Sequence, residues 1–161
     1  MHCAPKAESG TVSLHTATVV LVGFAEQDLK DLGKLFEQSE SRMASDYRWA
    51  VQPEADVAAV LRALHQERIP VVLCDQDLMP QAWREMLAHF ATVREPPSLI
   101  VSSRMADDRL WAEALNLGAY DVLARPFERD EVLRSVSLAG MHWWNRYPVR
   151  AATASAAAPA A

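Results

Sequence analysis

The feature that most constrains the fold is a short apolar run that leads directly into an acid, Val71-Val72-Leu73-Cys74-Asp75. The run is too short for a helix and predicts a strand that is buried on both faces, as in the middle of a parallel sheet. Pro80 keeps the following loop from curling at once into a helix. We therefore expect Asp75 at the carboxyl end of a central strand, the edge where open α/β sheets place their chemistry.

Strand-like and helix-like segments alternate along the whole chain. Their β-branched and apolar residues predict strands at residues 18–22, 47–52, 69–74, 98–102 and 120–124. Apolar residues at helical spacing predict helices at residues 26–38, 83–91, 107–117 and 130–144, and a second helix that Pro53 opens at its first position. Gly118 suits the left-handed cap of the fourth helix. This alternation predicts an α/β fold with a doubly wound, five-stranded parallel sheet.

Composition and charge exclude several classes of protein. Half of the 161 residues are hydrophobic, which is enough for one domain with a real core. The net charge of −5 argues against non-specific binding of nucleic acid, and the absence of any apolar run near 18 residues argues against a membrane span. Cys3 and Cys74 lie far apart, which predicts neither a disulfide nor a metal site and fits a reducing, cytoplasmic location.

The two ends of the chain differ from its middle. Residues 1–16 are predicted to be a disordered lead-in, and residues 1–10 lack the apolar core of a signal peptide. Residues 147–161 are rich in alanine and have no apolar stripe or charge pairs, which predicts a disordered tail. A single domain at residues 17–146 is expected between them.

Within this domain the residues resemble the receiver domain of bacterial two-component response regulators. The matching pieces are Asp75 at the third strand, Ser102-Ser103 after the fourth, and a run from Gly118-Ala119 to Arg125-Pro126-Phe127. That run is close to the family's Gly-Ala…Lys-Pro-Phe signature and is the most specific of the three. The resemblance covers residues 18–144 and implies the family's flavodoxin-like fold, a three-layer sandwich.

The resemblance also implies a role for three side chains. Asp75 would accept a phosphoryl group from a histidine kinase or phosphotransfer protein, the Ser103 hydroxyl would turn toward the phosphate, and Arg125 would pair with it. The family usually has Lys at the last position, and the planar fork of Arg gives a different geometry. Without an attached effector domain, we expect no enzymatic activity and an output through contacts with a downstream protein.

The first strand departs from the family pattern. The family has two acids directly after this strand, and they hold Mg²⁺; Gly23 and Phe24 stand there instead. Because Mg²⁺ needs an octahedral set of oxygens, Asp75 alone is expected to bind the ion only weakly. Phosphoryl transfer depends on such a cation, so it is expected to be slow. The candidates for an acidic pocket or metal site are Glu26, or Asp28 beside it, and Asp77.

Two functions from different classes stay open. The first is a single-domain receiver that is phosphorylated at Asp75. The second is a phosphorylation-independent interaction or dimerisation module, in which Arg125 pairs with Asp75 and holds the site in one state. Val122 supports the second, because the family often has an aromatic switch residue at that position. A small enzyme or nucleotide binder lacks any motif, since no glycine-rich phosphate loop follows the first strand.

Some of the candidate residues also have plain structural interpretations. Ser103 could bond to the loop backbone, and Asp77 could be a solvated loop acid. Trp143 and Trp144 are neighbours on a helix and point about 100° apart, so both cannot be buried on one face. One of them is therefore a candidate for a homodimer or partner surface.

Overall fold

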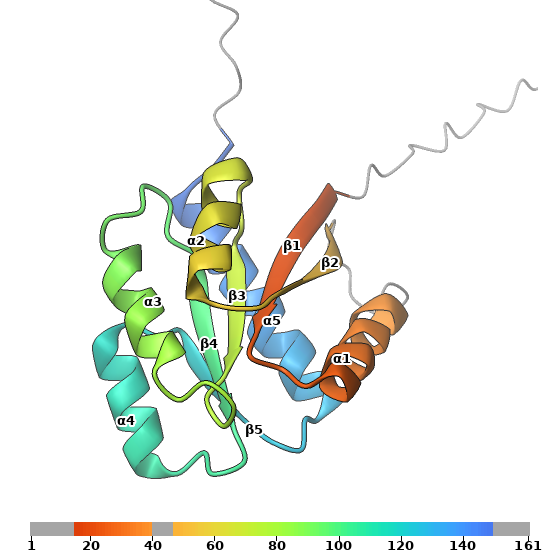
Figure 1. The fold of residues 1–161 in the computed structure, drawn as a ribbon. Coiled ribbons are helices and arrows are strands. Elements are labelled where there is room, and N and C mark those ends of the chain that lie inside the picture. The colour runs from red at the N-terminus through yellow and green to blue at the C-terminus, as the bar shows by residue number, and fades with distance from the viewer. Residues whose placement is uncertain (1–14, 40–46, 150–161) are drawn as a thin grey trace, which may run out of the picture.

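The computed structural model describes residues 15–39 and 47–149, in which five strands and five helices alternate (Figure 1). The strands are β1 (His15–Val22), β2 (Tyr47–Glu54), β3 (Val71–Asp75), β4 (Ser98–Ser103) and β5 (Asp121–Ala124). The helices are α1 (Glu26–Gln38), α2 (Val57–Gln66), α3 (Ala82–Phe90), α4 (Asp108–Leu117) and α5 (Arg129–Arg146). None of the helices in these two ranges is long and apolar enough to cross a membrane.

All neighbouring strands pair in parallel, in the order β2-β1-β3-β4-β5. Helices α1 and α5 cover one face of the sheet, and α2, α3 and α4 cover the other (Figure 1). The predicted doubly wound sheet is therefore confirmed, with the flavodoxin-like strand order. The order reverses between β1 and β3, and every residue of β3 is buried. The carboxyl ends of β1, β3, β4 and β5 consequently meet at one edge.

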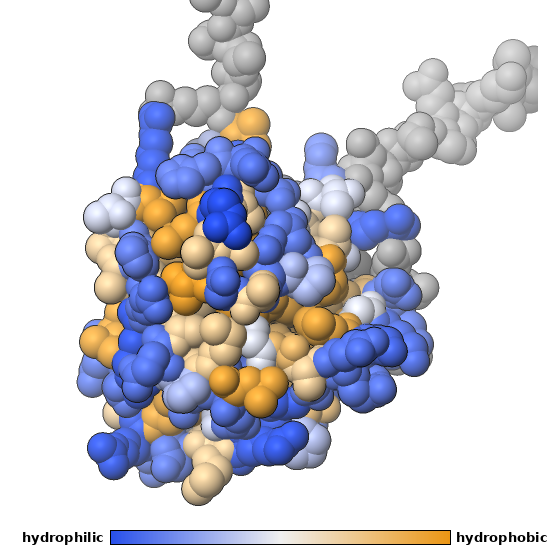
Figure 2. All heavy atoms as spheres, viewed as in Figure 1, coloured by the Kyte–Doolittle hydropathy of each residue, from blue (hydrophilic) through white to orange (hydrophobic). Residues whose placement is uncertain are grey.

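Each face of the sheet has its own hydrophobic core. Trp83 and Met86 of α3 are fully buried on one face, and Leu32 and Phe36 of α1 on the other. These residues belong to the apolar stripes that make the helices amphipathic. Figure 2 shows hydrophilic side chains over α1 and over much of the left and lower rim, with hydrophobic ones mainly in between.

The second helix begins later than the sequence predicts. Pro53 lies in β2 and not in the first turn of α2, so the prediction that it opens this helix is wrong. Asp56 is the N-cap, and its carboxylate accepts a hydrogen bond of 2.8 Å from the Ala59 amide. A proline is tolerated in β2 because this strand lies at the edge of the sheet and pairs only with β1.

The other boundaries differ from prediction by a few residues, and α1 agrees at both ends. β1 begins at His15, so the last two residues of the predicted lead-in belong to the strand. β3 begins two residues later than predicted and includes Asp75, and α5 extends to Arg146. The predicted lead-in and the alanine-rich tail otherwise lie mostly outside the described residues, so this division of the chain stays a prediction.

The two tryptophans at the end of α5 both pack within the molecule. Trp143 is buried, and its indole N–H donates a hydrogen bond of 3.1 Å to the Pro96 carbonyl. Trp144 is half-buried and stacks on Tyr47 of β2, with ring centroids 3.9 Å apart. One face of the Trp144 ring is therefore used inside the chain, against the edge strand.

Gly140 of α5 leaves room for the rings of Trp49 and Trp144 against the helix. A Cβ atom at this position would lie 2.7 Å from Trp49 and 2.9 Å from Trp144. We expect Gly140→Ala to lower the free energy of unfolding by about 1–2 kcal/mol, because overpacking outweighs the gain in helix propensity. Gly33→Ala in α1 is the matched control, since its Cβ would meet nothing within 4 Å. In urea denaturation, the free energy of unfolding of Gly33→Ala should equal or exceed that of the wild type. A Gly140→Ala variant more stable than the wild type would contradict the expectation.

Candidate functional site

The candidate site lies where the carboxyl ends of β3, β4 and β5 meet. Asp75 is the last residue of β3 and is fully buried. Ser102 of β4 stands beside Asp75 in the register of the sheet, and Ser103 ends the same strand. Arg125 follows β5 directly, and its peptide bond to Pro126 is cis. The sequence-predicted residues Asp75, Ser103 and Arg125 are thus brought to one edge of the sheet.

The Arg125 guanidinium joins two carboxylates. Its Nη1 lies 2.5 Å from Oδ2 of Asp75, and its Nη2 lies 2.5 Å from Oδ2 of Asp28, in the first turn of α1. The Arg125 side chain is only 7% exposed, and that of Asp28 is 26% exposed. Arginine suits this bridging position because its rigid planar fork presents two donors in different directions.

Two phenylalanines enclose the same guanidinium. The Arg125 Cζ atom lies 6.0 Å from the ring centroid of Phe24 and 5.4 Å from that of Phe127. Aromatic rings at this distance attract a cation, and more strongly when water is excluded. Arg125 is thus held by charge on one side and by aromatic rings on another. Phe24, which stands where the receiver resemblance predicts an acid, forms part of this enclosure.

Both oxygens of the Asp75 carboxyl have hydrogen-bond partners. Oδ2 accepts from Arg125, and Oδ1 accepts a bond of 2.9 Å from the Asp77 amide. Burial raises the pKa of Asp75 above its ordinary value, and the Asp77 amide and the Arg125 guanidinium act in the opposite direction without fully offsetting it. A buried carboxyl whose oxygens are both occupied is poorly placed to attack a phosphorus atom.

Ser103 bonds to Asp77 and to the loop backbone. Its hydroxyl donates to Oδ1 of Asp77 at 2.8 Å and accepts from the Met105 amide at 3.0 Å. Oδ2 of Asp77 accepts a further bond of 2.8 Å from the Arg104 amide. Asp77 is exposed, as expected of a solvated loop acid, but its carboxylate also accepts these two hydrogen bonds. The backbone interpretation of Ser103 is confirmed by its bond from the Met105 amide. Among the described residues, the buried Ser102 hydroxyl has no hydrogen-bond partner.

Of the two acids considered at the start of α1, the structure brings Asp28 to the site and not Glu26. Glu26 is exposed, and its Oε1 lies 3.1 Å from Lys30 Nζ on the same helix. The prediction that Glu26 belongs to an acidic pocket is therefore wrong. The first turn of α1 directs Asp28 toward the sheet edge, whereas Glu26, two positions earlier, faces solvent. The aromatic contacts of Arg125 and the hydrogen bond from the Arg104 amide to Asp77 were not predicted from the sequence.

The residues at this edge do not fit a magnesium ion. Gly23 has φ +77°, and a Cβ there would lie 3.0 Å from Met79 Cγ and 3.3 Å from the Asp75 carbonyl oxygen. Met79 thus fills the space beside the position of the first missing acid, while the guanidinium takes an oxygen of both Asp75 and Asp28. In the described part of the chain, no group of three or more His, Cys, Asp or Glu residues could hold a metal ion.

Comparison with known sequences gives one informative relative. No family model matches the chain. Regulatory protein VirG from Agrobacterium fabrum is 30% identical over 93 residues, which is 58% of this chain and 37% of VirG. The chain thus spans little more than a third of the length of this curated relative.

Solved structures match a larger part of the chain than this relative does. The signal receiver domain of an HD domain-containing protein from Pseudomonas fluorescens has a TM-score of 0.67 at 20% identity, covering 87% of this chain and 97% of that one. A Thermotoga maritima response regulator scores 0.65 at 18% identity, with coverages of 78% and 98%. The chemotaxis response regulator CheY4 of Vibrio cholerae scores 0.62 at 14% identity, with coverages of 77% and 98%. The resemblance is therefore confirmed in the fold: this chain has the fold of response-regulator receiver domains.

Proposed function

We propose that this chain is a receiver-type module of two-component signalling that acts through protein contacts, without phosphorylation of Asp75. The observation that supports this is the state of Asp75, which is 0% exposed and has one carboxylate oxygen held by Arg125. The other oxygen is held by the Asp77 amide. The side chain that the receiver resemblance makes the phosphoacceptor is therefore closed off.

The electrostatics of the site support the same proposal. Phosphoryl transfer requires an oxygen that can approach the phosphorus in line and cations that neutralise the transferred oxygens. Here the guanidinium occupies the approach to Oδ2 of Asp75. Its positive charge is already shared by Asp75 and Asp28, so the three side chains carry a net negative charge when both acids are ionised. An incoming phosphoryl group would find no unpaired cation among them.

As an interaction module, the domain would work as an adaptor or a dimerisation unit. Its partners would be a histidine kinase or phosphotransfer protein, a downstream protein, or a second copy of the chain. It would have no enzymatic activity of its own. The module would act in the cytoplasm, as the sequence predicts, and the free, buried thiol of Cys74 suits that reducing location. Burial raises the pKa of this thiol to about 12, so it stays protonated.

One observation favours a second candidate function, a receiver that is phosphorylated at Asp75. Asp75, Ser103 and Arg125 all lie at the same edge of the sheet, at the ends of β3, β4 and β5. For phosphorylation to occur, Arg125 would first have to leave Asp75 and expose it to a phosphodonor. The two candidates therefore differ in whether the Arg125–Asp75 pair opens.

Small phosphodonors separate the two candidates. The purified protein is treated with acetyl phosphate, or with beryllofluoride and Mg²⁺, while a conventional receiver domain serves as the positive control. Trp83 is a built-in reporter, because its indole N–H donates a bond of 2.9 Å to Gln76, next to Asp75. We expect no change in Trp fluorescence or in the NMR signals of the Asp75 and Asp77 amides. A saturable change that Asp75→Asn abolishes would overturn the proposal in favour of phosphorylation.

A further inference from the structure

One side chain connects the loop after β3 with the loop after β4. The two carboxylate oxygens of Asp77 accept separate hydrogen bonds, each of 2.8 Å, from the Ser103 hydroxyl and the Arg104 amide. The same Ser103 oxygen accepts from the Met105 amide at 3.0 Å. The start of the β4–α4 loop is thus attached to a single carboxylate that lies 26 or 27 positions earlier in the chain.

A hydroxyl and an adjacent backbone amide that point at the same anion form a receptor for oxyanions. Hydrogen bonds to an ionised carboxylate are roughly twice as strong as those between neutral groups. The receiver resemblance assigns the Ser103 hydroxyl to a phosphoryl group on Asp75. In this structure the same hydroxyl is directed at Asp77. A phosphoryl group would have to displace the Asp77 carboxylate in order to be bound there.

We propose that Asp77 is the resident anion of this loop. Its carboxylate takes the Ser103 hydroxyl and the Arg104 amide in place of a phosphoryl group, and it holds the β4–α4 loop permanently in the observed conformation. This inference rests on the proposed function, in which no phosphoryl group on Asp75 is present to take the Ser103 hydroxyl and the Arg104 amide. The loop is then constitutively in a single state.

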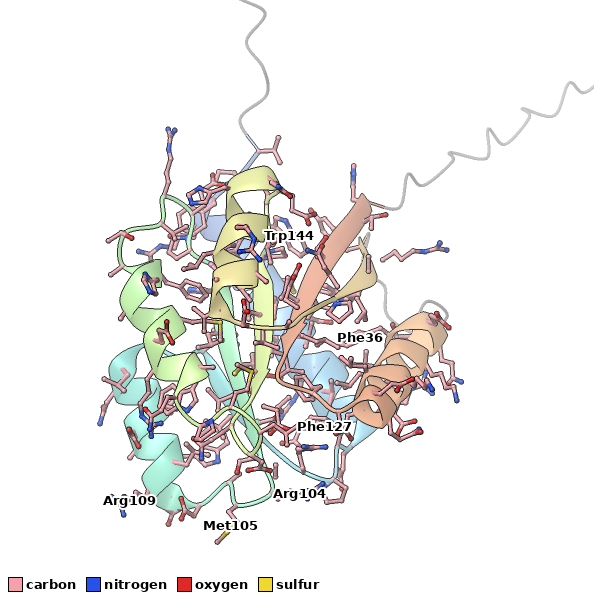
Figure 3. All side chains as sticks on the ribbon, in the orientation of Figure 1. Phe36, Arg104, Met105, Arg109, Phe127 and Trp144 are labelled. Atoms are coloured by element: carbon pink, nitrogen blue, oxygen red, sulfur yellow. The ribbon has the colours of Figure 1, made fainter. Side chains whose placement is uncertain are left out.

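Further hydrogen bonds join the β4–α4 loop to the start of α4. The Asp107 amide donates to the Met105 carbonyl at 2.9 Å, and the Asp107 carboxylate caps α4 by accepting from the Leu110 amide at 2.9 Å. Figure 3 shows Arg104 and Met105 at the lower end of the molecule, and Arg109 of α4 at the same end. Met105 is 77% exposed. Asp77 therefore determines how Arg104 and Met105 are presented to a partner.

Hydrogen exchange of the loop amides tests the proposal in the absence of phosphodonors and divalent cations. In Asp77→Ala the Arg104 and Met105 amides should exchange roughly tenfold faster or more, as expected for the loss of a charged hydrogen bond. Asp77→Asn keeps one acceptor oxygen and should give an intermediate effect. Asp108→Ala removes an exposed acid of the first turn of α4 and is the matched control, with exchange as in wild type. Unchanged exchange in Asp77→Ala would overturn the proposal.

Rescue by an added anion separates an anion site from a merely structural loop contact. Inorganic phosphate, titrated into Asp77→Ala, should restore slow exchange of the Arg104 and Met105 amides in a saturable manner. It should have no effect on wild type, where Asp77 already occupies the receptor, or on Asp77→Ala/Ser103→Ala, which lacks the hydroxyl. Faster exchange that phosphate does not reverse would overturn the role of Asp77 as a resident anion.

The outcome is distinguishable from a failure of the proposed function. Exchange of the loop amides is measured on unphosphorylated protein and does not depend on whether Asp75 can react. Labelling of Asp75 by a phosphodonor would overturn the proposed function while the exchange and rescue results stand. Conversely, an unreactive Asp75 with an unaffected Asp77→Ala loop would leave the proposed function intact and reject the resident anion.

Discussion

Replacing Arg125 with Met should lower the free energy of unfolding at pH 7 by about 3–5 kcal/mol, the range observed when one partner of a buried ion pair is removed. Met approximates the length of the side chain but leaves the Asp75 carboxylate fully buried with only the Asp77 amide as a partner. The contacts of the guanidinium with Phe24 and Phe127 are lost as well. Urea denaturation of the purified variant measures the difference.

Asp28→Asn is the matched control for the Arg125 variant. It removes the other carboxylate of the bridge, which is 26% exposed, and leaves the buried Arg125–Asp75 pair in place. We expect a loss below about 1 kcal/mol, because a partly exposed ion pair contributes little. An Arg125→Met variant as stable as Asp28→Asn would contradict the assignment of Arg125 as the counter-ion on which buried Asp75 depends.

The stability deficit of Arg125→Met should also depend on pH. Burial already raises the pKa of Asp75, and removing the guanidinium raises it further. The folded state then binds a proton more tightly than the unfolded chain, so stability decreases as the pH rises through the folded-state pKa of Asp75. The deficit relative to wild type should therefore shrink as the pH is lowered toward about 4, near the unfolded-state value.

Much of the fold could be predicted because its signals are local. The apolar stripe and acidic first turn of α1 predicted both of its ends, and Gly118 caps α4 with φ +106° as expected. Pro53 was misassigned because the first turn of a helix and an edge strand both tolerate a residue without an amide hydrogen. The sequence does not show which strand will lie at the edge, since that depends on the order of strands in the finished sheet.

The site was harder to predict than the fold. Asp75 could be placed at the sheet edge from its own strand, and the receiver resemblance pointed to Ser103 and Arg125 beside it. The pairing of Arg125 with Asp75 could be stated as one alternative. The partner of each side chain depends on rotamers and on loops from distant parts of the chain. For this reason Asp28 could not be distinguished from Glu26, and the bonds from Ser103 and Arg104 to Asp77 were not foreseen.

An acid at position 23, where the receiver resemblance predicts the first of two acids, should destabilise the protein rather than create a metal site. Gly23→Asp places a side chain at φ +77° and a Cβ within 3.0 Å of Met79, and we expect a loss of about 2–4 kcal/mol from backbone strain and overpacking together. Gly23→Ala and Gly118→Ala separate the two effects, because Gly118 also has a positive φ but its Cβ would meet nothing within 4 Å. In urea denaturation, Gly23→Ala should lose more free energy of unfolding than Gly118→Ala. Equal losses would show that contact with Met79 does not contribute.

Acids at both positions 23 and 24 should not raise the affinity for a metal ion while Arg125 is in place. Gly23→Asp/Phe24→Asp should bind Mg²⁺ no better than wild type in calorimetric titration, because Arg125 still holds an oxygen of both Asp75 and Asp28. Adding Arg125→Met should create a measurable divalent site, since the carboxylates then lose their resident cation and gain acidic neighbours. Mg²⁺ binding with Arg125 intact would instead show that the guanidinium leaves readily, which favours phosphorylation of Asp75. The residues at positions 23, 24 and 125 are thus expected to act together, each disfavouring the metal chemistry in a different way.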